Sequence, residues 1–314
     1  MEGVFDAPMR AVIAEVGGFD FAVSEFIRVS AQAIRGKTIL EYVPELSGVP
    51  LGRVALPVQV QLLGCDPERL AETAIEACVV GARAIDLNFG CPSPTVNRHS
   101  GGAAVLKEPL LIRKIVEQVR RAVPEQIPVS AKIRLGWESS DEVADVAQAA
   151  GDGGASWLVV HARTRAQMYK RGVNWDAVRR AASVVRVPVI ANGDIFRVED
   201  FEESRLLSGC AHFMLGRGVL RDPLLALRCK QPVADPLTVS PLGAMLSTIA
   251  RFIELMSPRA INSGYVPCRI KQWVKFVRLI DVEFIPRDLM TAVGRAKESR
   301  ELLDLLGSYV EAQR

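Results

Sequence analysis

Short runs of apolar residues alternate along the chain with longer segments in which apolar residues recur at helical spacing. Seven of the short runs have the length and composition of strands: residues 21–26, 57–63, 84–89, 128–134, 157–162, 188–192 and 211–216. Helical patterns lie between most of them, for example at 67–80, 109–122, 141–151 and 175–185. This alternation predicts an α/β fold with parallel strands joined by crossover helices.

A (β/α)8 TIM barrel is the fold class that the alternation favours, and it requires eight parallel strands. The only place for the eighth is ahead of residues 1–4, so we expect the chain to begin inside or just after its first barrel strand. An open doubly wound sheet is the alternative, and its usual sign is a Gly-x-Gly-x-x-Gly loop after the first strand. The sequence has no such loop.

The alternation stops near residues 232–241, where prolines cluster. Beyond this point, residues 242–256, 269–280 and 289–309 show apolar residues at helical spacing. We therefore predict two domains: the α/β domain over residues 1–236 and an all-helical domain over residues 237–314.

Composition argues against several classes of protein. Hydrophobic residues make up 49% of the chain, yet no run approaches the roughly 18 apolar residues of a membrane span. The first residues lack a signal-peptide pattern, and the six cysteines include no C-x-x-C pair or nearby histidine cluster. These features favour a cytoplasmic protein without disulfides or a metal site. The net charge of +3 arises in residues 241–314, which hold 11 Lys or Arg against 8 Asp or Glu.

Two glycine-containing loops follow the runs that would be the seventh and eighth barrel strands. They are Asn192-Gly193-Asp194 and Gly216-Arg217-Gly218. Loops at these places commonly hold a phosphate, because glycines let backbone N–H groups approach it and an arginine pairs with its charge. Each motif alone also forms ordinary turns. Their joint position favours a cofactor that carries a phosphate.

Lys132 lies on the polar face of a predicted strand. Ser130 and Arg134 share that face, and helices must cover the other one, so Lys132 is predicted to point into the barrel. A lysine there needs an anion or an electron-rich ring close by. The alternative is a lysine at the sheet edge that extends its ammonium to water.

Gln61 and His161 are further polar candidates. Gln61 shares one face of its strand with Gln59, and both amides are equally compatible with satisfied polar groups in the core. His161 lies at the C-terminal end of its strand, where such barrels place their chemistry, although a single histidine on a strand is often structural.

Cys91 is the candidate for chemistry on a thiol. It follows the apolar run Ile85-Asp86-Leu87-Asn88-Phe89 in a Gly-Cys-Pro turn, whereas most cysteines pack as small buried hydrophobic residues. No basic residue adjoins it in the sequence to stabilise a thiolate. A protonated thiol suits a proton donor better than a standing nucleophile.

These segments resemble the tRNA-dihydrouridine synthases, flavin enzymes that reduce a uridine in tRNA. The resemblance covers nearly the whole chain and rests on Gly3-Val4-Phe5-Asp6-Ala7-Pro8-Met9-Arg10, Val60-Gln61-Leu62-Leu63-Gly64, Asp86-Leu87-Asn88-Phe89-Gly90-Cys91-Pro92, Lys132-Ile133-Arg134, Val160-His161-Ala162-Arg163-Thr164, Ile190-Ala191-Asn192-Gly193-Asp194 and Leu215-Gly216-Arg217. The Gly-Cys-Pro turn after a Leu-Asn strand end is the most specific of them. Residues 25–29, Arg134 and residues 269–273 make the chain most similar to the C-type enzymes, which act on position 16 of the D-loop.

The resemblance implies a flavin-binding barrel followed by a helical RNA-binding domain. It implies tightly bound FMN, reduced by NADPH that then leaves, and it makes Cys91 the donor of a proton to C5 of uracil. The residues that it places against FMN are Met1, Gln61, Lys132, His161, Asn192, Gly193, Asp194, Gly216 and Arg217. Residues expected on the tRNA side are Arg28, Asn88, Arg134, Arg269, Lys271, Lys275 and Arg278. The last four lie at helical spacing, which is also usual for a solvated helix face.

One departure concerns the start of the sequence. The family pattern has a short apolar strand ending in Ala-Pro ahead of residue 1, and from its absence we expect a barrel that closes poorly and holds FMN weakly. The alternatives are a small-molecule flavin barrel of the dihydropyrimidine or dihydroorotate type, and an RNA-binding protein that has lost its chemistry. We expect a monomer that binds tRNA and neither a metal nor a membrane.

Overall fold

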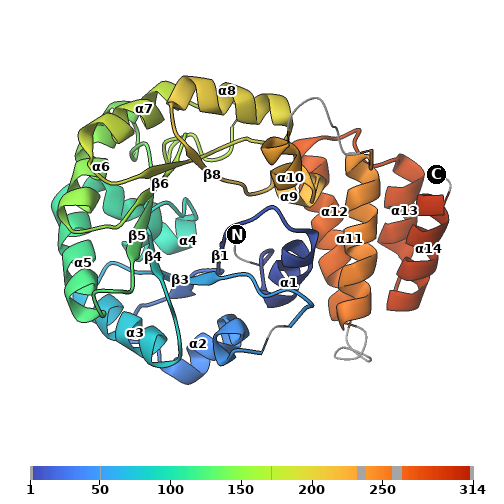
Figure 1. Cartoon of the computed structure of the whole chain (residues 1–314), viewed down its shortest axis with the longest axis horizontal. Coiled ribbons are helices and arrows are strands. Elements are labelled where there is room, and N and C mark those ends of the chain that lie inside the picture. Colours follow the sequence, from blue (N-terminus) through green and yellow to red (C-terminus); the bar gives the residue numbers. More distant parts are fainter. Residues whose placement is uncertain (1–2, 50, 171, 232–237, 257–263, 312–314) are drawn as a thin grey trace.

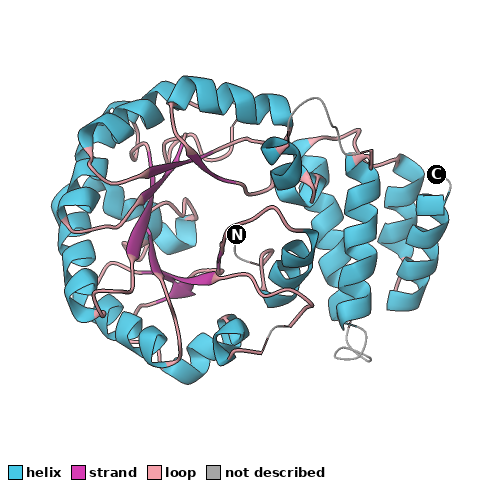
Figure 2. Ribbon diagram, in the orientation of Figure 1, coloured by secondary structure: helices cyan, strands magenta, loops and turns pink. Residues whose placement is uncertain are grey.

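A computed structural model of the chain describes residues 3–49, 51–170, 172–231, 238–256 and 264–311. Its strands are short and parallel, and they form a curled sheet in the order β1-β3-β4-β5-β6-β7-β8, with β2 also beside β3. The strands are β1 (Ala22–Val23), β2 (Ile27–Arg28), β3 (Val58–Leu63), β4 (Ile85–Asn88), β5 (Val129–Arg134), β6 (Leu158–His161), β7 (Val189–Asn192) and β8 (His212–Met214). Helices surround the outer face of this sheet, so the predicted α/β architecture is confirmed (Figure 1 and Figure 2).

Helices follow the strands where the alternation predicts them. Four of them begin and end close to the predicted bounds: α3 (Pro67–Val79), α5 (Pro109–Ala122), α6 (Val143–Asp152) and α7 (Trp175–Val184). Further helices of this part of the chain are α2 (Gly36–Tyr42), α4 (Pro94–Asn97), α8 (Val198–Ser208), α9 (Gly218–Arg221) and α10 (Leu225–Lys230). Short 3₁₀ helices cover Pro44–Ser47, Gly102–Lys107 and Ser140–Glu142.

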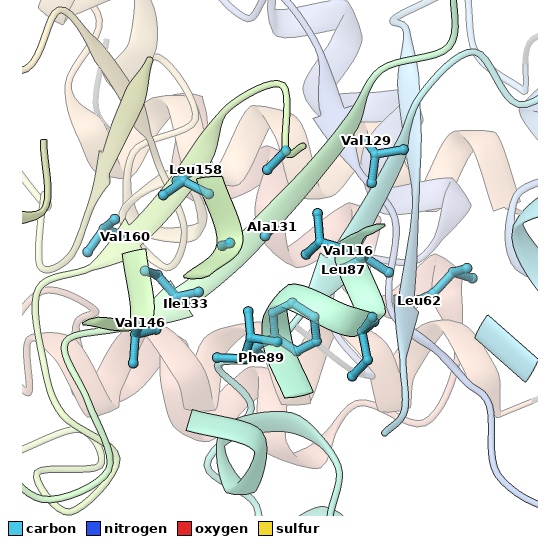
Figure 3. Packing of buried hydrophobic residues seen from close by; sticks show 14 of the residues in the cluster. Leu62, Leu87, Phe89, Val116, Val129, Ala131, Ile133, Val146, Leu158 and Val160 are labelled. Carbon is cyan, nitrogen blue, oxygen red and sulfur yellow. The ribbon is translucent and has the colours of Figure 1, made fainter. Parts of the chain in front are cut away.

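The main core lies between the sheet and the helices around it. Val129, Ala131 and Ile133 of β5 are fully buried in this core, because alternate side chains of a strand face the same side. Figure 3 shows them near Val116 of α5 and Val146 of α6. The same alternation turns the polar residues of β5 toward the inside of the curled sheet.

The register of the strands brings their polar C-terminal ends to one level. Asn88 pairs with Lys132, Arg134 pairs with His161, and His161 pairs with Asn192. Residues from β4, β5, β6 and β7 therefore meet at one rim of the sheet, which is the rim where barrels of this type place their chemistry.

The first predicted strand, 21–26, is wrong as a single strand. β1 pairs with the beginning of β3 and β2 pairs with its end. Between them, the hydroxyl oxygen of Ser24 accepts the backbone N–H of Gln61 at 3.0 Å, in place of a backbone carbonyl. Within the described part of the chain the sheet does not close, since β8 pairs with β7 alone.

The C-terminal region is helical, as predicted, and contains α11 (Pro241–Met256), α12 (Tyr265–Ile280), α13 (Arg287–Arg295) and α14 (Ser299–Glu311). The predicted helix 289–309 is wrong, because α13 ends at Arg295 and α14 begins at Ser299. The backbone N–H of Lys297 donates to the carboxylate of Glu301 at 2.8 Å. The predicted domain boundary after residue 236 lies outside the described residues.

α1 (Ala7–Val16) is absent from the predicted elements. Asp6 caps its N-terminus, and the Asp6 carboxylate accepts the N–H of Met9 at 3.1 Å. Its residues are buried on almost every side, so it lacks the polar face that marks an amphipathic helix. Met9 and Ile13 join Phe252 of α11 and Trp273 of α12 in a second hydrophobic core. Figure 1 shows α1 beside α11, at the opening of the ring of helices.

Candidate active site

Lys132 lies half-buried on the inner side of the sheet. Its ammonium donates to Oδ1 of Asn192 at 3.0 Å, and the Asn192 amide donates to the carbonyl of Met214 at 2.9 Å. Burial of the ammonium, followed by the charge of Arg134, lowers the pKa of Lys132 to about 8, against the opposing effect of Asp86. The ammonium is therefore held inside the site by β7 instead of extending from an edge strand.

His161 lies at the neighbouring strand end. Its Nδ1 is buried and has no hydrogen-bond partner among the described residues. Burial, and after it the positive charges of Arg134 and Lys132, holds the pKa of His161 well below its usual value. The imidazole is therefore neutral at neutral pH, and its buried Nδ1 is a polar atom whose hydrogen bond a bound ligand can supply.

The two predicted phosphate loops lie against each other. The carboxylate of Asp194 accepts hydrogen bonds from Arg163 and from Arg217, the latter at 3.0 Å. A Cβ on Gly218 would overlap the carbonyl oxygen of Ile195, so the second loop packs directly on the first.

The glycines in these loops differ in their surroundings. Gly193 has a φ of +153°, and a Cβ there would lie 3.2 Å from the ring of Trp175. A Cβ on Gly216 would meet nothing within 4 Å. A side chain at Gly193 would therefore crowd its own loop, whereas the position of a Cβ on Gly216 is open, which leaves room for a ligand beside that backbone.

A chain of buried side chains crosses β5, β3 and β4. Asp86 accepts from Ser130 at 2.5 Å and from the Gln61 amide at 2.7 Å. The Gln61 oxygen in turn accepts from the Asn88 amide at 2.8 Å. Burial raises the pKa of Asp86 to about 6, although both hydrogen bonds and the charge of Lys132 oppose it. Neighbouring Gln59 keeps a buried Oε1 with no hydrogen-bond partner in the described residues.

Cys91 is half-buried in the loop that follows β4, and it packs beside the cluster of Phe26, Leu63 and Val96. The Asn88 oxygen accepts the N–H groups of Gly90 and Cys91, both at 3.0 Å. The thiol is close enough to Lys132 and Arg134 to affect the pKa of both. Cys91 therefore belongs to the same site as Lys132, at the C-terminal rim of the sheet.

The carbonyl of Cys91 is held from the other side of the loop. It accepts the N–H of Ala103 at 2.9 Å and the Asn97 amide at 3.0 Å. Asn97 also accepts from Arg165 at 3.1 Å, and the Arg165 guanidinium lies over the ring of Trp137 at 4.5 Å. The loop is thus fixed at both the N–H and the C=O side of Cys91.

Arg134 joins the Cys91 loop to the loop after β6. Its guanidinium donates to the carbonyls of Gly90 at 2.8 Å, Thr164 at 3.0 Å and Met168 at 3.1 Å. The ring of Tyr169 lies over Arg134 at 5.6 Å. Burial lowers the pKa of this guanidinium, which nevertheless stays charged.

Sequence reasoning missed Tyr169, which also lies over Arg217 at 5.0 Å. Its position depends on Met168, which has a φ of 50°, a conformation that the sequence does not signal at a methionine. Its place in the loop after a strand that ends in histidine was the one available indication. Asp86, Asn97 and Arg163 were missed as well.

The predicted tRNA-side residues fall into two groups. Lys275 and Arg278 are exposed on α12, Lys271 is half-buried there, and Arg28 donates to the carbonyl of Thr95 at 3.4 Å. Arg269 is different, because its side chain is only 10% exposed and its guanidinium lies 3.0 Å from Asp6 and donates to Val4 at 2.8 Å. We therefore leave Arg269 out of the proposed RNA surface.

Met1 lies outside the described residues. Within the described ranges, no group of three or more His, Cys, Asp or Glu side chains is arranged to hold a metal ion. None of the described helices has the length and apolar character needed to cross a membrane.

The donor set of the site fits a flavin nucleotide. Lys132, Arg134, Arg163 and Arg217 surround it with positive charge, and Asp86 and Asp194 only partly balance that charge. The unpartnered His161 nitrogen and the open space at Gly216 are the features expected for a polar ring and a phosphate. FMN, an anion with a polar ring edge, therefore matches the residues that are present.

Comparison with known proteins agrees with these features. Residues 1–260 match the family model described as dihydrouridine synthase. The chain is 43% identical over 306 residues to the tRNA-dihydrouridine(16) synthase of Aquipseudomonas alcaligenes, covering 98% of this chain and 96% of that protein. It is 42% identical over 314 residues to the enzyme of the same name from Pseudomonas putida, covering 100% of this chain and 96% of that protein.

Among solved structures, histamine dehydrogenase from Rhizobium sp. 4-9 matches with a TM-score of 0.53 and 13% identity, covering 81% of this chain and 47% of that chain. At this identity the likeness concerns the fold alone, and it agrees with a barrel of parallel strands surrounded by helices. The family match and the near-complete coverage of the relatives lead to one conclusion. The chain belongs to the dihydrouridine synthase family, whose members are oxidoreductases.

Proposed function

We propose that this protein reduces a uridine in the D-loop of tRNA, at position 16, to 5,6-dihydrouridine, with FMN as cofactor and NADPH as the source of electrons. The relatives named tRNA-dihydrouridine(16) synthase support the substrate and the position. The observation that carries the proposal is the half-buried Cys91 in the same rim as the Lys132–Asn192 pair and the Arg217 loop. A protonated thiol beside cationic groups suits proton delivery to a base that gains negative charge.

FMN, when bound, supplies the hydride that reaches C6 of the uracil ring. On this proposal the protein's residues hold it by its two ends. Arg217 and the N–H groups at Gly193 and Gly216 bind the phosphate, with Asp194 orienting Arg217. Lys132, His161, Asn192 and Gln61 contact the ring system, where the ammonium of Lys132 favours negative charge.

Cys91 delivers the proton that completes the reduction. Hydride addition at C6 leaves negative charge on C5 and the adjacent carbonyl of uracil, and the Cys91 thiol donates its proton to C5. The thiolate that remains lies among the positive charges of Lys132 and Arg134, which stabilise it until a proton from solvent replaces the one transferred.

Asn88 and Arg134 have donors that can still reach the uracil edge. The Asn88 amide nitrogen uses one hydrogen on Gln61, and Arg134 has five donors for its backbone partners and the base. A uridine in folded tRNA must leave its stack to enter the site. Arg28, Lys271, Lys275 and Arg278 supply positive charge for the phosphates of the same tRNA.

The test is a reaction of the FMN-loaded protein with NADPH and an unmodified tRNA transcript, read by mass spectrometry of tRNA fragments. We expect one fragment, containing position 16, to gain the mass of two hydrogen atoms. Cys91→Ala should lose this product while retaining the flavin spectrum and tRNA binding, and Cys268→Ala, at an exposed cysteine, should behave as the native protein. Reduction of free uracil or orotate but not of tRNA would contradict the proposal.

A further inference from the structure

We infer that Asp86 is a positioning residue, whose carboxylate sets the direction of a hydrogen-bond chain through Gln61 and Asn88 that orients the backbone at Cys91. The inference rests on the proposed function in taking Cys91 as the proton donor. It concerns a residue that touches neither the thiol nor the expected position of the uracil, and that acts on them through two amide side chains.

The direction of the chain follows from the Cys91 end. The N–H groups of Gly90 and Cys91 can only donate, so the group that meets them must be the oxygen of the Asn88 amide. The Asn88 nitrogen then faces Gln61 at 2.8 Å and requires the Gln61 oxygen as its acceptor. The Gln61 nitrogen is thereby left to face Asp86, at 2.7 Å.

The same direction follows from the Asp86 end. A carboxylate only accepts, so it holds the Gln61 nitrogen toward itself and the Gln61 oxygen toward Asn88. Its other oxygen accepts from Ser130 at 2.5 Å. Asp86 and Ser130 are both 0% exposed, so no water competes for either carboxylate oxygen.

An amide that turned over would break the chain at two places. If Gln61 reversed, its oxygen would face the Asp86 carboxylate and its nitrogen would face the nitrogen of Asn88, which is unfavourable at both contacts. Asn88 could respond only by turning its nitrogen toward the N–H groups of Gly90 and Cys91. The carboxylate of Asp86 therefore excludes a second arrangement of the turn that carries the thiol.

These hydrogen bonds fix the backbone that carries the Cys91 sulfur, and with it the place from which the thiol donates its proton. The carbonyl of Cys91 is held by Ala103 and Asn97, and its N–H is held by Asn88, so the peptide groups on both sides of the residue are fixed. Without the Asn88 contact, the N–H side of the peptide between Gly90 and Cys91 loses its acceptor, and the bond from Arg134 to the Gly90 carbonyl holds that peptide at one end. A displacement of about 1 Å is enough to slow a proton transfer by about 100-fold.

The first test exchanges the carboxylate and the amide at the two ends of the chain. Asn88→Asp can still accept the N–H groups at Gly90 and Cys91 but cannot donate to Gln61. The Gln61 oxygen then faces a carboxylate at residue 88 while the Gln61 nitrogen still donates to Asp86. In the double variant Asp86→Asn with Asn88→Asp, Gln61 can reverse, donating to residue 88 and accepting from residue 86. The charge of the pair is the same as in the native protein.

The readout is the rate at which iodoacetamide alkylates Cys91, measured by peptide mass spectrometry on the folded protein. We expect Asn88→Asp to raise the rate constant of the Cys91 thiolate, taken from the pH dependence of alkylation, at least fivefold, because the Gln61 oxygen repels the new carboxylate away from the N–H groups of Gly90 and Cys91. The double variant should return this rate constant to within about twofold of native. Ser130→Ala, which removes the other partner of Asp86 but leaves the chain intact, should also react at the native rate. A native rate in Asn88→Asp, or a double variant as reactive as Asn88→Asp, would overturn the inference.

The second test measures catalysis. Asp86→Leu should lower kcat for tRNA reduction about 100-fold and change KM by less than about threefold, because the phosphate contacts that dominate tRNA binding remain while the thiol is misplaced. An unchanged kcat, or a loss confined to KM, would count against the inference, and the exchange variants decide the matter if Asp86→Leu does not fold. Alkylation requires no tRNA chemistry. A native protein that leaves tRNA unreduced while alkylation follows the expected pattern would therefore refute the proposed function and retain the role of Asp86.

Discussion

Asp86, which is fully buried, and Lys132, which is half-buried, carry opposite charges within the candidate site. Burial raises the pKa of Asp86 to about 6 and lowers the pKa of Lys132 to about 8. Each residue is therefore mostly ionised at pH 7, although its pKa lies only about one unit away, and each charge stabilises the charged form of the other residue. Removing one of the two charges should change both the free energy of unfolding and its dependence on pH.

Asp86→Asn is expected to gain stability relative to the native protein as the pH rises. The folded-state pKa of Asp86, about 6, lies above the ordinary value of 3.8 for this side chain, so the native fold binds this proton more tightly than the unfolded chain does. Its contribution to stability is fully present below the unfolded pKa and is lost as the pH rises through about 6. From pH 5 to pH 7.5 the variant should gain about 1 kcal/mol on the native protein.

Urea denaturation of both proteins at these two pH values measures the effect. Asp141→Asn, at an exposed carboxylate, is the control and should show the same stability difference from native at both pH values. A difference between Asp86→Asn and native that stays constant, or that falls with pH, would show that Asp86 is not held with a raised pKa.

At the scale of elements, the loop between β4 and α5 depends on one glycine. Gly102 has a φ of +59°, and a Cβ there would lie 2.8 Å from the Cys91 carbonyl oxygen. The neighbouring Gly101 has an ordinary φ of −97°, and its nearest contact would be a side-chain atom of Leu63 at 3.2 Å. The two positions therefore separate the effect of strain at Cys91 from the effect of a methyl group in this loop.

Gly102→Ala should destabilise the protein by about 2 kcal/mol, because a left-handed alanine and a backbone clash coincide. It should also lower tRNA reduction by Cys91, since the carbonyl that Gly102 approaches belongs to the reacting residue. Gly101→Ala should cost less than about 1 kcal/mol and keep most of the activity. Thermal denaturation and initial rates test both, and equal effects of the two substitutions would contradict the assignment.

The strand ends of the candidate site could be predicted from the sequence, because a parallel sheet brings the C-terminal ends of its strands to one rim whatever the details of packing. Lys132, Asn192 and Cys91 were placed in this way. Tyr169 could not be, because its position rests on a left-handed Met168. The single strand over 21–26 was wrong because the pattern of apolar residues carries no sign that the Ser24 hydroxyl replaces a ladder bond.

Arg269 illustrates the limit set by distance along the chain. The basic residues of α12 taken together favour contact with phosphate, yet at about 100° per residue Arg269 lies on the side of the helix opposite Arg278. Its actual partner, Asp6, lies at the other end of the sequence and caps α1. α1 itself gave no amphipathic signal because both the barrel and α11 bury it.

For the whole molecule, the second hydrophobic core joins the first residues of the described chain to the last helices. Glu15 of α1 pairs with Arg251 of α11 at 2.7 Å, and Tyr265 of α12 donates to Asp6 at 2.6 Å. The helical region is thus packed on α1 as one core, and deleting it would uncover apolar surface of α1. Single substitutions on α12 are the better probe of its role.

Arg269→Met should lower stability by about 2 kcal/mol, because it leaves Asp6 half-buried with one partner fewer and breaks the bond to Val4. Lys275→Met, on the exposed face of the same helix, should change stability by less than about 0.5 kcal/mol. Chemical denaturation compares the two. If the Arg269→Met protein is as stable as the Lys275→Met protein, the Arg269 guanidinium does not stabilise the contact between α12 and the residues around Asp6.

For tRNA binding, in contrast to stability, the exposed residues Lys275 and Arg278 of α12 should matter more than Arg269. Lys275→Met and Arg278→Met should each weaken binding and reduce the slope of log K against log salt concentration by about 1, as expected for a lost phosphate contact. Arg179→Met, at an exposed arginine of α7, is the control and should leave the slope unchanged. Binding titrations at several salt concentrations test this, and an unchanged slope in both α12 variants would exclude this face from the RNA surface.

The hydrogen bond between Tyr265 and Asp6 spans 259 positions of the sequence. During synthesis on the ribosome, the segment around Asp6 emerges well before its partner on α12 exists. Contacts between such distant positions carry a high loop-closure entropy and form late. The crossover units from β3 to β8 can assemble as they appear, whereas α1, although translated early, reaches its final place only after the last helices have left the ribosome.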